Sequence, residues 1–218
     1  MELYHVLNRG VDKREIFIDD GDRARFIHNL YEFNDTKPAP DVYRMHMRDL
    51  RSPTSHKRLR LVDIHGWVLM GNHYHLLLSE CIEGGLTQYI RKLNIGYAKY
   101  FNERYTRSGT LFQGRTKKIL IASDAHFLFI LHYIHLNPLD FLTGAENWRE
   151  GNIESAREAL KYLDAYRWSS YLDYCGEHNI PSLITKELFI GVLGNIQKAT
   201  ANFLRDREVT SLQGMRLE

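Results

Sequence analysis

Two pairs of side chains in the 218-residue sequence have types and spacings that could do chemistry together. His73 and His75 are two residues apart in a stretch typical of a β-strand, so both imidazoles would project from one face and could bind one metal ion. Tyr133 and Asn137 are four residues apart in a predicted helix, so they would share one helix face. Each pair also has a purely structural interpretation, as hydrogen-bonded core histidines and as a boundary tyrosine with its hydroxyl in water.

The elements that would position these residues follow one another in an ordered way. Hydrophobic periodicity and turn residues predict strands at 4–7, 61–70, 73–78 and 117–122 and helices at 22–33, 85–105 and 125–137. The order strand, helix, strand, strand, helix, strand is the ferredoxin-like split βαβ plan, so the predicted fold class is α+β, with an antiparallel sheet and helices packed on it. The two strands around Gly71-Asn72 are apolar on both faces, which favours a central hairpin that is covered on each side.

The chain is expected to divide into a domain at 1–140 and a helical C-terminal extension at 141–218. The extension contains an acidic helical pattern near 153–164 and a last helix predicted at 185–207. Residues 34–60 are polar, basic and interrupted by proline, which favours a long mobile loop, either a tolerated insertion or a segment that orders on contact with a partner.

Composition excludes several classes of protein. With 44% hydrophobic and 26% charged residues, the chain can form an ordinary globular core without disulfides. Only two cysteines, Cys81 and Cys175, are present, which suits a reducing compartment. The sequence has no apolar run long enough to span a bilayer and no pattern of a secretory signal at its N-terminus. We therefore expect a cytoplasmic protein with no membrane partner.

The net charge of +2 conceals a strong segregation of charge. Residues 87–118 hold eight basic residues and one acidic residue, a net charge of +7, and residues 37–60 carry +5. The rest of the chain must then be acidic. Such a distribution can attract a polyanion, although solvated basic faces are the alternative. We expect the basic residues of 87–118 to border the cleft that contains His73, His75 and Tyr133.

Five short blocks resemble, in order, the motifs of single-tyrosine HUH transposases, the insertion-sequence 200-like transposases. They read YHVLNRG at 4–10, MGNHYHLLL at 70–78, SGTLFQGR at 108–115, YIHLNP at 133–138 and RWSSY at 167–171. The last block is similar to a segment of the REP-associated tyrosine transposases, which look like the closest branch. The sequence departs from the family at Gly71, where proline is usual, and at 139–141, where it reads LDF in place of an expected Val-Arg-Ala.

The resemblance implies an enzyme that nicks single-stranded DNA and transfers strands through a covalent 5′-phosphotyrosine. Tyr133 would be the nucleophile, and His73 and His75 would hold a divalent ion that polarises the scissile phosphate. Asn137 would complete the metal site where the broader family has glutamine. Mg²⁺ or Mn²⁺ would suit this site, although the ligand set would also tolerate Zn²⁺.

The resemblance also implies single-stranded DNA with hairpin, REP-like elements as the partner, and a homodimer as in the broader family. For phosphate contacts the sequence favours Arg115, Lys117 and Lys118, which follow the glycine-containing loop, and then Arg9 and Arg14 beside the first strand. The aromatic residues interleaved with the basic ones at 97–112 could stack on bases, although most of them fit a buried helix stripe. Two alternatives stay open: a relative that binds structured DNA without cutting it, and a metal-dependent hydrolase without a covalent step.

Overall fold

The computed structural model describes residues 1–38 and 58–205. These residues form one antiparallel sheet of four strands, β1 (Leu3–Arg9), β2 (Val62–Leu69), β3 (His73–Glu80) and β4 (Lys117–Leu120). The strand order is β2-β3-β1-β4. With one helix after β1 and another after β3, this topology is the predicted ferredoxin-like split βαβ plan, which confirms the α+β fold class.

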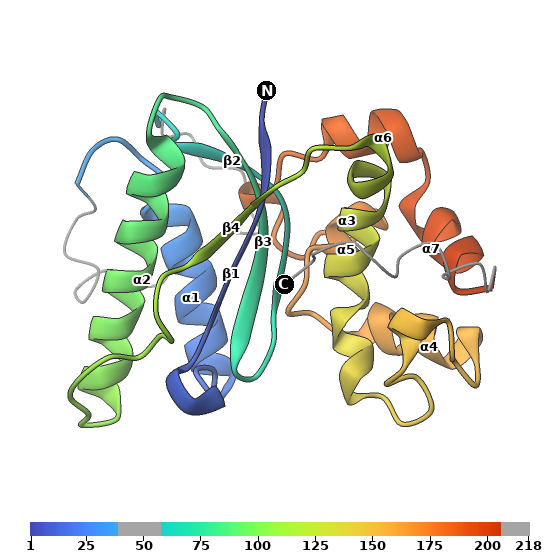
Figure 1. Ribbon diagram of the computed structural model, residues 1–218, viewed down its shortest axis with the longest axis horizontal. Helices are drawn as coiled ribbons and strands as arrows, with labels where there is room; N and C mark the ends of the chain where they lie inside the picture. The colour runs from blue at the N-terminus through green and yellow to red at the C-terminus, as the bar shows by residue number, and fades with distance from the viewer. Residues whose placement is uncertain (39–57, 206–218) are drawn as a thin grey trace.

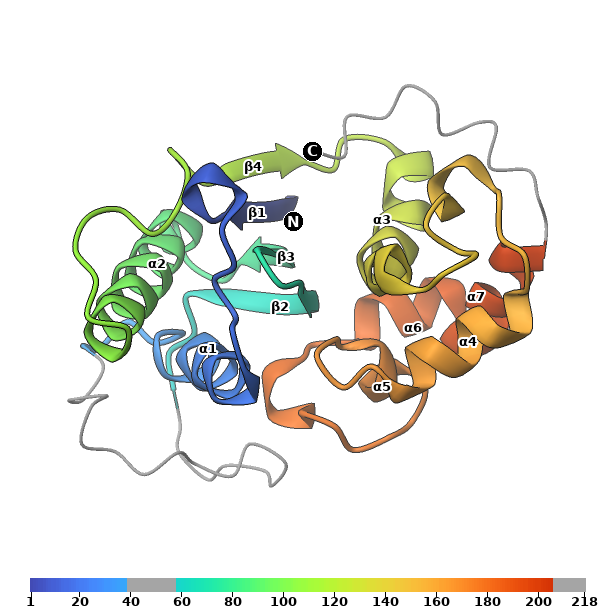
Figure 2. The same ribbon diagram turned by 90° about the horizontal axis from the view of Figure 1, so that it is seen from below.

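Two helices, α1 (Asp20–Glu32) and α2 (Gly85–Arg104), cover one face of the sheet (Figures 1 and 2). The Asp19 carboxylate accepts from the Asp22 backbone N–H and so caps α1, because the first N–H groups of a helix have no partner within it. Phe33 lies against Gly96 so closely that a β-carbon at that glycine would be 2.4 Å from the phenylalanine ring. The glycine therefore permits the close approach of α2 to the end of α1.

The opposite face of the sheet is covered by α3 (Asp124–Leu136) and by the C-terminal region behind it (Figure 2). Ser123 caps α3, because its side chain accepts from the His126 N–H. Leu3, Val68 and Leu77 of the sheet pack with Ile130 and Ile134 of α3 in one buried apolar cluster. The sheet is thus a layer between two helical layers, and α2 and α3 lie on opposite sides of it.

The C-terminal region consists of short helices, α4 (Ala156–Ala165), α5 (Tyr171–Tyr174), α6 (Glu187–Leu193) and α7 (Ile196–Arg205). The prediction of one last helix from 185 to 207 was wrong, because Gly194 has a positive φ of 64° and ends α6 before α7 begins. The acidic helical pattern near 153–164 corresponds to α4.

The predicted hairpin forms, but only β3 is central. β2 lies at the edge of the sheet, and segments from the C-terminal region cover its outer side. The Leu69 N–H donates to the Trp168 carbonyl at 2.9 Å, and the Thr185 N–H donates to the Ile64 carbonyl at 2.8 Å. These bonds satisfy backbone groups that an open edge would expose, and the apolar residues on both faces of β2 pack into the two buried clusters. Most of the loop predicted at 34–60 lies outside the described residues.

Candidate functional site

The candidate site lies between the sheet and α3. In the strand register, Leu7 of β1 pairs with His75 of β3, and Arg9 pairs with His73. The two histidines therefore project from the face of the sheet that α3 covers, as the spacing of two residues predicts. Their ring centroids are 4.9 Å apart.

Tyr133 faces this histidine pair from α3. Its ring meets the His75 ring edge-on at 5.8 Å between centroids, and its side chain is only 2% exposed. The structural interpretation of Tyr133 as a boundary tyrosine was wrong, since the residue is buried in the layer between α3 and the sheet. The fold thus brings the histidine pair and Tyr133 together, but with the tyrosine side chain buried.

A third histidine, His5 of β1, completes the cluster. Its Nε2 lies 2.8 Å from Nδ1 of His75 in a hydrogen bond between two fully buried rings. The His5 and His75 rings are stacked at 5.1 Å, and His5 also meets Tyr133 edge-on. The sequence did not single out His5 as a site residue, because its contact with His75 depends on the pairing of strands that are 70 residues apart in the chain.

Burial controls the protonation of the cluster. The pKa of His75 lies well below 6.5, because burial removes water from the charged form and the neighbouring His5, His73, Arg149 and Arg9 oppose a further positive charge. A neutral imidazole is the form that binds a metal ion. Near neutral pH His75 is therefore in the protonation state that a metal site requires.

Asn137 and Tyr133 share one helix face, as predicted, but the Asn137 carboxamide has partners within the protein. Its Nδ2 donates to the Tyr133 carbonyl at 2.7 Å, and its Oδ1 accepts from Arg149 at 2.9 Å. To bind a cation, the Asn137 oxygen must either accept from Arg149 at the same time or first lose that hydrogen bond.

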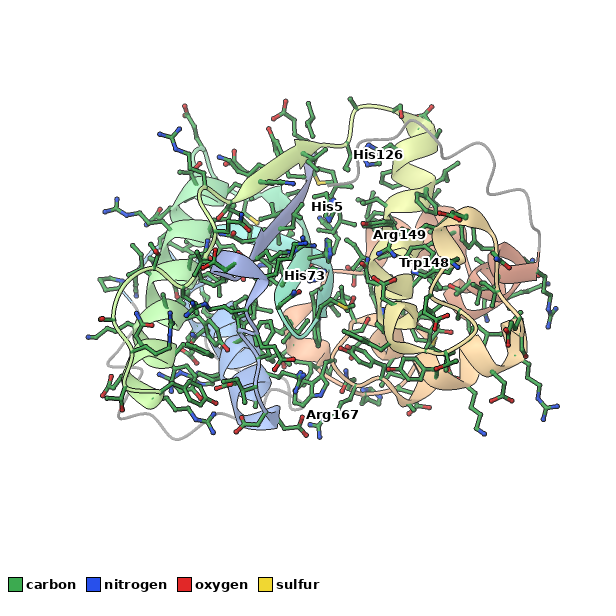
Figure 3. The ribbon with its side chains drawn as sticks, turned by 60° about the horizontal axis from the view of Figure 1, so that its bottom comes forward. His5, His73, His126, Trp148, Arg149 and Arg167 are labelled. Atoms are coloured by element: carbon green, nitrogen blue, oxygen red, sulfur yellow. The ribbon has the colours of Figure 1, made fainter. Side chains whose placement is uncertain are left out.

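Arg149 is a second residue that the sequence did not single out. It forms an ion pair with Asp140, and its guanidinium lies 4.5 Å from the Trp148 ring and 5.4 Å from the Tyr133 ring (Figure 3). Burial alone would lower the Arg149 pKa, but the hydrogen bond and charge of Asp140 outweigh burial and raise it, with a hydrogen bond to Tyr133 contributing. A fixed positive charge therefore lies beside the candidate nucleophile. No local sequence pattern predicts the contact of Arg149 with Tyr133, because it depends on the turn of the chain after α3.

Among the described residues, no group of three or more His, Cys, Asp or Glu side chains is arranged to hold a metal ion. The donor set nevertheless fits an open site with two protein ligands. Nε2 of His75 is buried and has no hydrogen-bond partner in the described part of the chain. A buried ring nitrogen without a hydrogen-bond partner is costly, and binding of a cation by its lone pair would remove that cost. His73 and His75 could therefore hold a divalent ion, with water or phosphate oxygens as its other ligands.

A basic pocket of about 390 Å³ lies beside the histidine pair, at the ends of β1 and β4. Its basic lining residues are Arg9, Lys13, Arg115 and Lys117. Three of the five predicted phosphate-contacting residues, Arg9, Arg115 and Lys117, thus come together. Arg14 does not line this pocket, and its Nε donates to the Val11 carbonyl.

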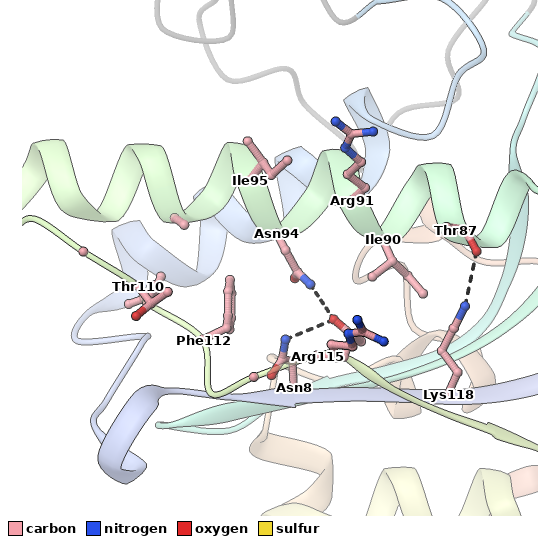
Figure 4. Close-up of a pocket in the computed structure, with 15 residues that line it drawn as sticks. Asn8, Thr87, Ile90, Arg91, Asn94, Ile95, Thr110, Phe112, Arg115 and Lys118 are labelled. Carbon is pink, nitrogen blue, oxygen red and sulfur yellow. Dashed lines mark hydrogen bonds between the residues drawn. The ribbon is translucent and has the colours of Figure 1, made fainter.

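A larger groove of about 740 Å³ lies on the other side of the sheet, between α2 and β4 (Figure 4). Arg91, Arg115 and Lys118 line it, and Lys118 donates to Thr87 across it. Ile90, Ile95 and Phe112 supply apolar surface. Arg115 lines both the groove and the basic pocket, so the two regions meet at β4.

The expectation that the whole basic stretch borders the histidine site was wrong. Four of its eight cations lie on α2 itself, and α2 packs on the face of the sheet opposite Tyr133. Lys92 is bound to backbone carbonyls near the end of α1, and Arg104 forms ion pairs with Asp19 and Asp22. The aromatic residues there are largely structural: Tyr97 and Phe101 are buried in the core.

The fold and the site define a ferredoxin-like α+β protein with a histidine cluster that faces a helix-borne tyrosine. No protein-family model matches the chain, and no curated protein matches it. Among solved structures, the chain is similar to one titled "Structure of the REP associates tyrosine transposase bound to a REP hairpin". The TM-score is 0.47 at 11% sequence identity, over 86% of each chain, so the likeness is a distant one of fold. No helix in the described part of the chain is long and apolar enough to cross a membrane.

Proposed function

We propose that this protein nicks single-stranded DNA next to a hairpin and transfers the cut strand through a covalent bond to Tyr133. The observation that carries the proposal is that Tyr133 of α3 lies against the pair formed by His73 and His75 of β3 in one buried layer. Tyr133 is 58 residues from His75 in the sequence. The resemblance of five sequence blocks to single-tyrosine transposases supports the same assignment.

In the proposed reaction, the Tyr133 hydroxyl oxygen attacks the phosphorus of a phosphodiester. A bond forms between this oxygen and phosphorus, and the bond from phosphorus to the 3′-oxygen breaks. The phenolic proton leaves to water, and the 3′-oxygen takes up a proton, which gives a 5′-phosphotyrosine and a free 3′-hydroxyl. The reverse attack by a 3′-hydroxyl rejoins DNA without an external energy source, because the ester bond is conserved.

A free tyrosine has a pKa near 10, so forming the phenolate at pH 7 costs about 4 kcal/mol. In this proposal His73 and His75 would hold Mg²⁺ or Mn²⁺, and the ion would supply Lewis-acid polarisation of the phosphate. Arg149 adds a positive charge beside the attacking oxygen, where negative charge develops. Since Tyr133 is 2% exposed and its ring packs against Trp148, the proposal requires a local movement around Tyr133 before a phosphodiester can reach the hydroxyl.

The DNA path in this proposal follows the edge of the sheet at β4. Phosphates next to the cut would contact Arg9, Arg115 and Lys117 in the basic pocket. The groove behind β4 would take unpaired nucleotides, with the sugar or base on Ile95 and phosphates on Arg91 and Lys118. None of the described residues that line the groove is acidic, so nothing there repels a phosphate.

One observation favours a second candidate function, DNA binding without cleavage. Tyr133 is buried, and the Asn137 oxygen that would complete the metal site accepts from Arg149. A relative that had lost cleavage could keep this closed arrangement permanently.

One experiment separates the two functions. The full chain is incubated with a library of hairpin-containing single strands and Mn²⁺, and DNA that stays attached after denaturation is sequenced and mapped to its residue by mass spectrometry. Cleavage requires an adduct on Tyr133. Enrichment of hairpins by native capture with no adduct would instead support binding alone, and failure of both would reject both functions.

A further inference from the structure

His5 is placed to control how His75 presents its ring. The two imidazoles share one hydrogen bond of 2.8 Å, from ring nitrogen to ring nitrogen, and both side chains have no exposed surface. Their planes are only 17° from parallel. In β1, His5 pairs with Leu77, one step along the same face from His75. The contact is therefore fixed by strand register as well as by the side chains.

The shared hydrogen bond allows two arrangements of protons. A neutral imidazole carries a single N–H, so only one of the two rings donates in this bond. If His5 Nε2–H donates, then Nδ1 of His75 is the acceptor and its proton must sit on Nε2. That nitrogen is buried with no acceptor among the described residues, so an N–H there would stay unsatisfied. If His75 Nδ1–H donates instead, Nε2 of His75 carries a lone pair, and the single proton of His5 sits on its Nδ1, which is also buried. The hydrogen bond alone therefore allows both arrangements, and the use of the Nε2 lone pair by a cation favours the second one.

We propose that His5 is a positioning residue: it accepts the Nδ1–H of His75 and so holds that ring with the Nε2 lone pair ready for a cation. The proposal rests on the proposed function, which gives the lone pair its purpose. Metal-binding histidines commonly donate their second ring N–H to a fixed acceptor, which sets both tautomer and orientation. Here the acceptor is another imidazole, and the stacked rings also restrain rotation of His75.

The tautomer can be measured on the metal-free protein by long-range ¹H–¹⁵N correlation spectra of ¹⁵N-histidine-labelled chain. We expect the His75 signals of the Nδ1–H form in the unaltered protein. His5→Leu removes the acceptor and should move His75 toward the Nε2–H form. His5→Gln supplies a carbonyl oxygen as acceptor and should restore the Nδ1–H form. An Nε2–H form of His75 in the unaltered protein would overturn the proposal without recourse to any variant.

Cation affinity gives a second measurement, by electron paramagnetic resonance titration with Mn²⁺ alone. Loss of such a supporting partner typically weakens metal binding by about 10–100-fold, so His5→Leu should fall in that range and His5→Gln should recover most of the loss. His135→Leu is the matched control, since His135 is equally buried and its ring bonds to Ser170 beside β2 rather than to His75. Equal effects of His5→Leu and His135→Leu on Mn²⁺ affinity would assign His5 a merely structural role.

The two proposals can fail separately. If the unaltered chain forms no adduct with DNA while the His75 tautomer shifts as expected, then the nicking function is rejected and the role of His5 stands. If adducts form but the tautomer does not respond to His5→Leu, then the role of His5 is rejected and the nicking function stands.

Discussion

The guanidinium of Arg149 lies 5.4 Å from the centre of the Tyr133 ring, held there by Asp140 and by the carboxamide oxygen of Asn137. The arrangement links the proposed nucleophile to a segment beyond α3. It gives Asn137 a definite partner: the residue that sequence resemblance assigns to the metal site here orients a cation beside the tyrosine. The same contacts pack against the buried Tyr133 ring. Arg149 therefore bears both on how DNA reaches the tyrosine hydroxyl and on the charge beside it.

Replacement of this guanidinium should weaken catalysis more than binding. We expect Arg149→Met to slow covalent adduct formation by about 10²-fold, because a fixed charge near the developing phenolate is lost. Stability should fall by about 1–2 kcal/mol with the loss of the bonds to Asp140 and Asn137. Single-turnover adduct formation and urea unfolding measure the two effects. Arg167→Met is the control, since Arg167 also lies 4.5 Å from a tryptophan ring, that of Trp168. Faster adduct formation in Arg149→Met would show that Arg149 only keeps the site closed.

Removal of one oxygen tests the nucleophile itself. Tyr133→Phe should abolish the covalent adduct and leave hairpin affinity within about twofold, because the ring and its packing remain. Tyr89→Phe is the matched control: Tyr89 is also buried, and its hydroxyl donates to the Leu30 carbonyl on the opposite face of the sheet. Denaturing gel electrophoresis of labelled DNA detects the adduct. An adduct that persists in Tyr133→Phe would assign the nucleophile to another residue.

Local patterns predicted the parts of the site that depend on one element. Alternation in a strand is enough to place His73 and His75 on one face, and helical spacing is enough to align Tyr133 with Asn137. Local patterns do not predict which elements contact one another in the folded chain. The contact of His5 with His75 depends on the register of β1 against β3, and that of Arg149 depends on a turn beyond α3.

The charge pattern was misleading for a related reason. Net charge along the chain says nothing about the side of a sheet that a helix covers. Since α2 and α3 pack on opposite faces, the cations of α2 are separated from Tyr133 by the sheet itself. Only the residues near the start of β4 lie at the edge where the two faces meet, as Arg115 does by lining both cavities.

The basic pocket predicts a specific salt dependence. Lys117→Gln should reduce the slope of log affinity against log salt by about one, the effect of losing one phosphate contact. Lys161→Gln is the control, because Lys161 is an exposed residue of α4 in the C-terminal region. Fluorescence anisotropy with a labelled hairpin strand between low and moderate salt measures the slope. Equal slopes for the two variants would exclude Lys117 from the DNA path.

The groove behind β4 can be tested by adding a negative charge. Ile95 is 59% exposed on α2 and lines the groove, so Ile95→Glu should keep the fold and repel phosphates. We expect hairpin affinity to fall at least about tenfold at low salt, with less loss as salt rises. Leu128→Glu places the same change at a 46% exposed site on α3, away from the groove, and should have little effect. Equal affinities for both variants would remove the groove from the path.

Acid should loosen the contact between α3 and α7 through His132. Burial lowers the pKa of His132 to about 4, and its ring stacks on Phe203 and hydrogen-bonds Thr200. The unfolded chain has a histidine pKa near 6.5. Since the folded state favours the neutral form, this contribution is complete above about pH 6.5 and is lost as pH falls toward 4. Full loss corresponds to about 3 kcal/mol.

Urea unfolding at pH 7.5 and 4.5 measures this effect as a difference between proteins. His132→Gln cannot gain a proton, so the unaltered protein should lose up to about 2–3 kcal/mol more on acidification than the variant does. Asp173, whose pKa burial raises to about 6, acts in the opposite direction in this range, because its neutral form is favoured in the folded state. Its effect is common to both proteins and cancels in the difference. Identical losses in both proteins would mean that His132 is hydrated, and that α7 is not held against a dry face of α3.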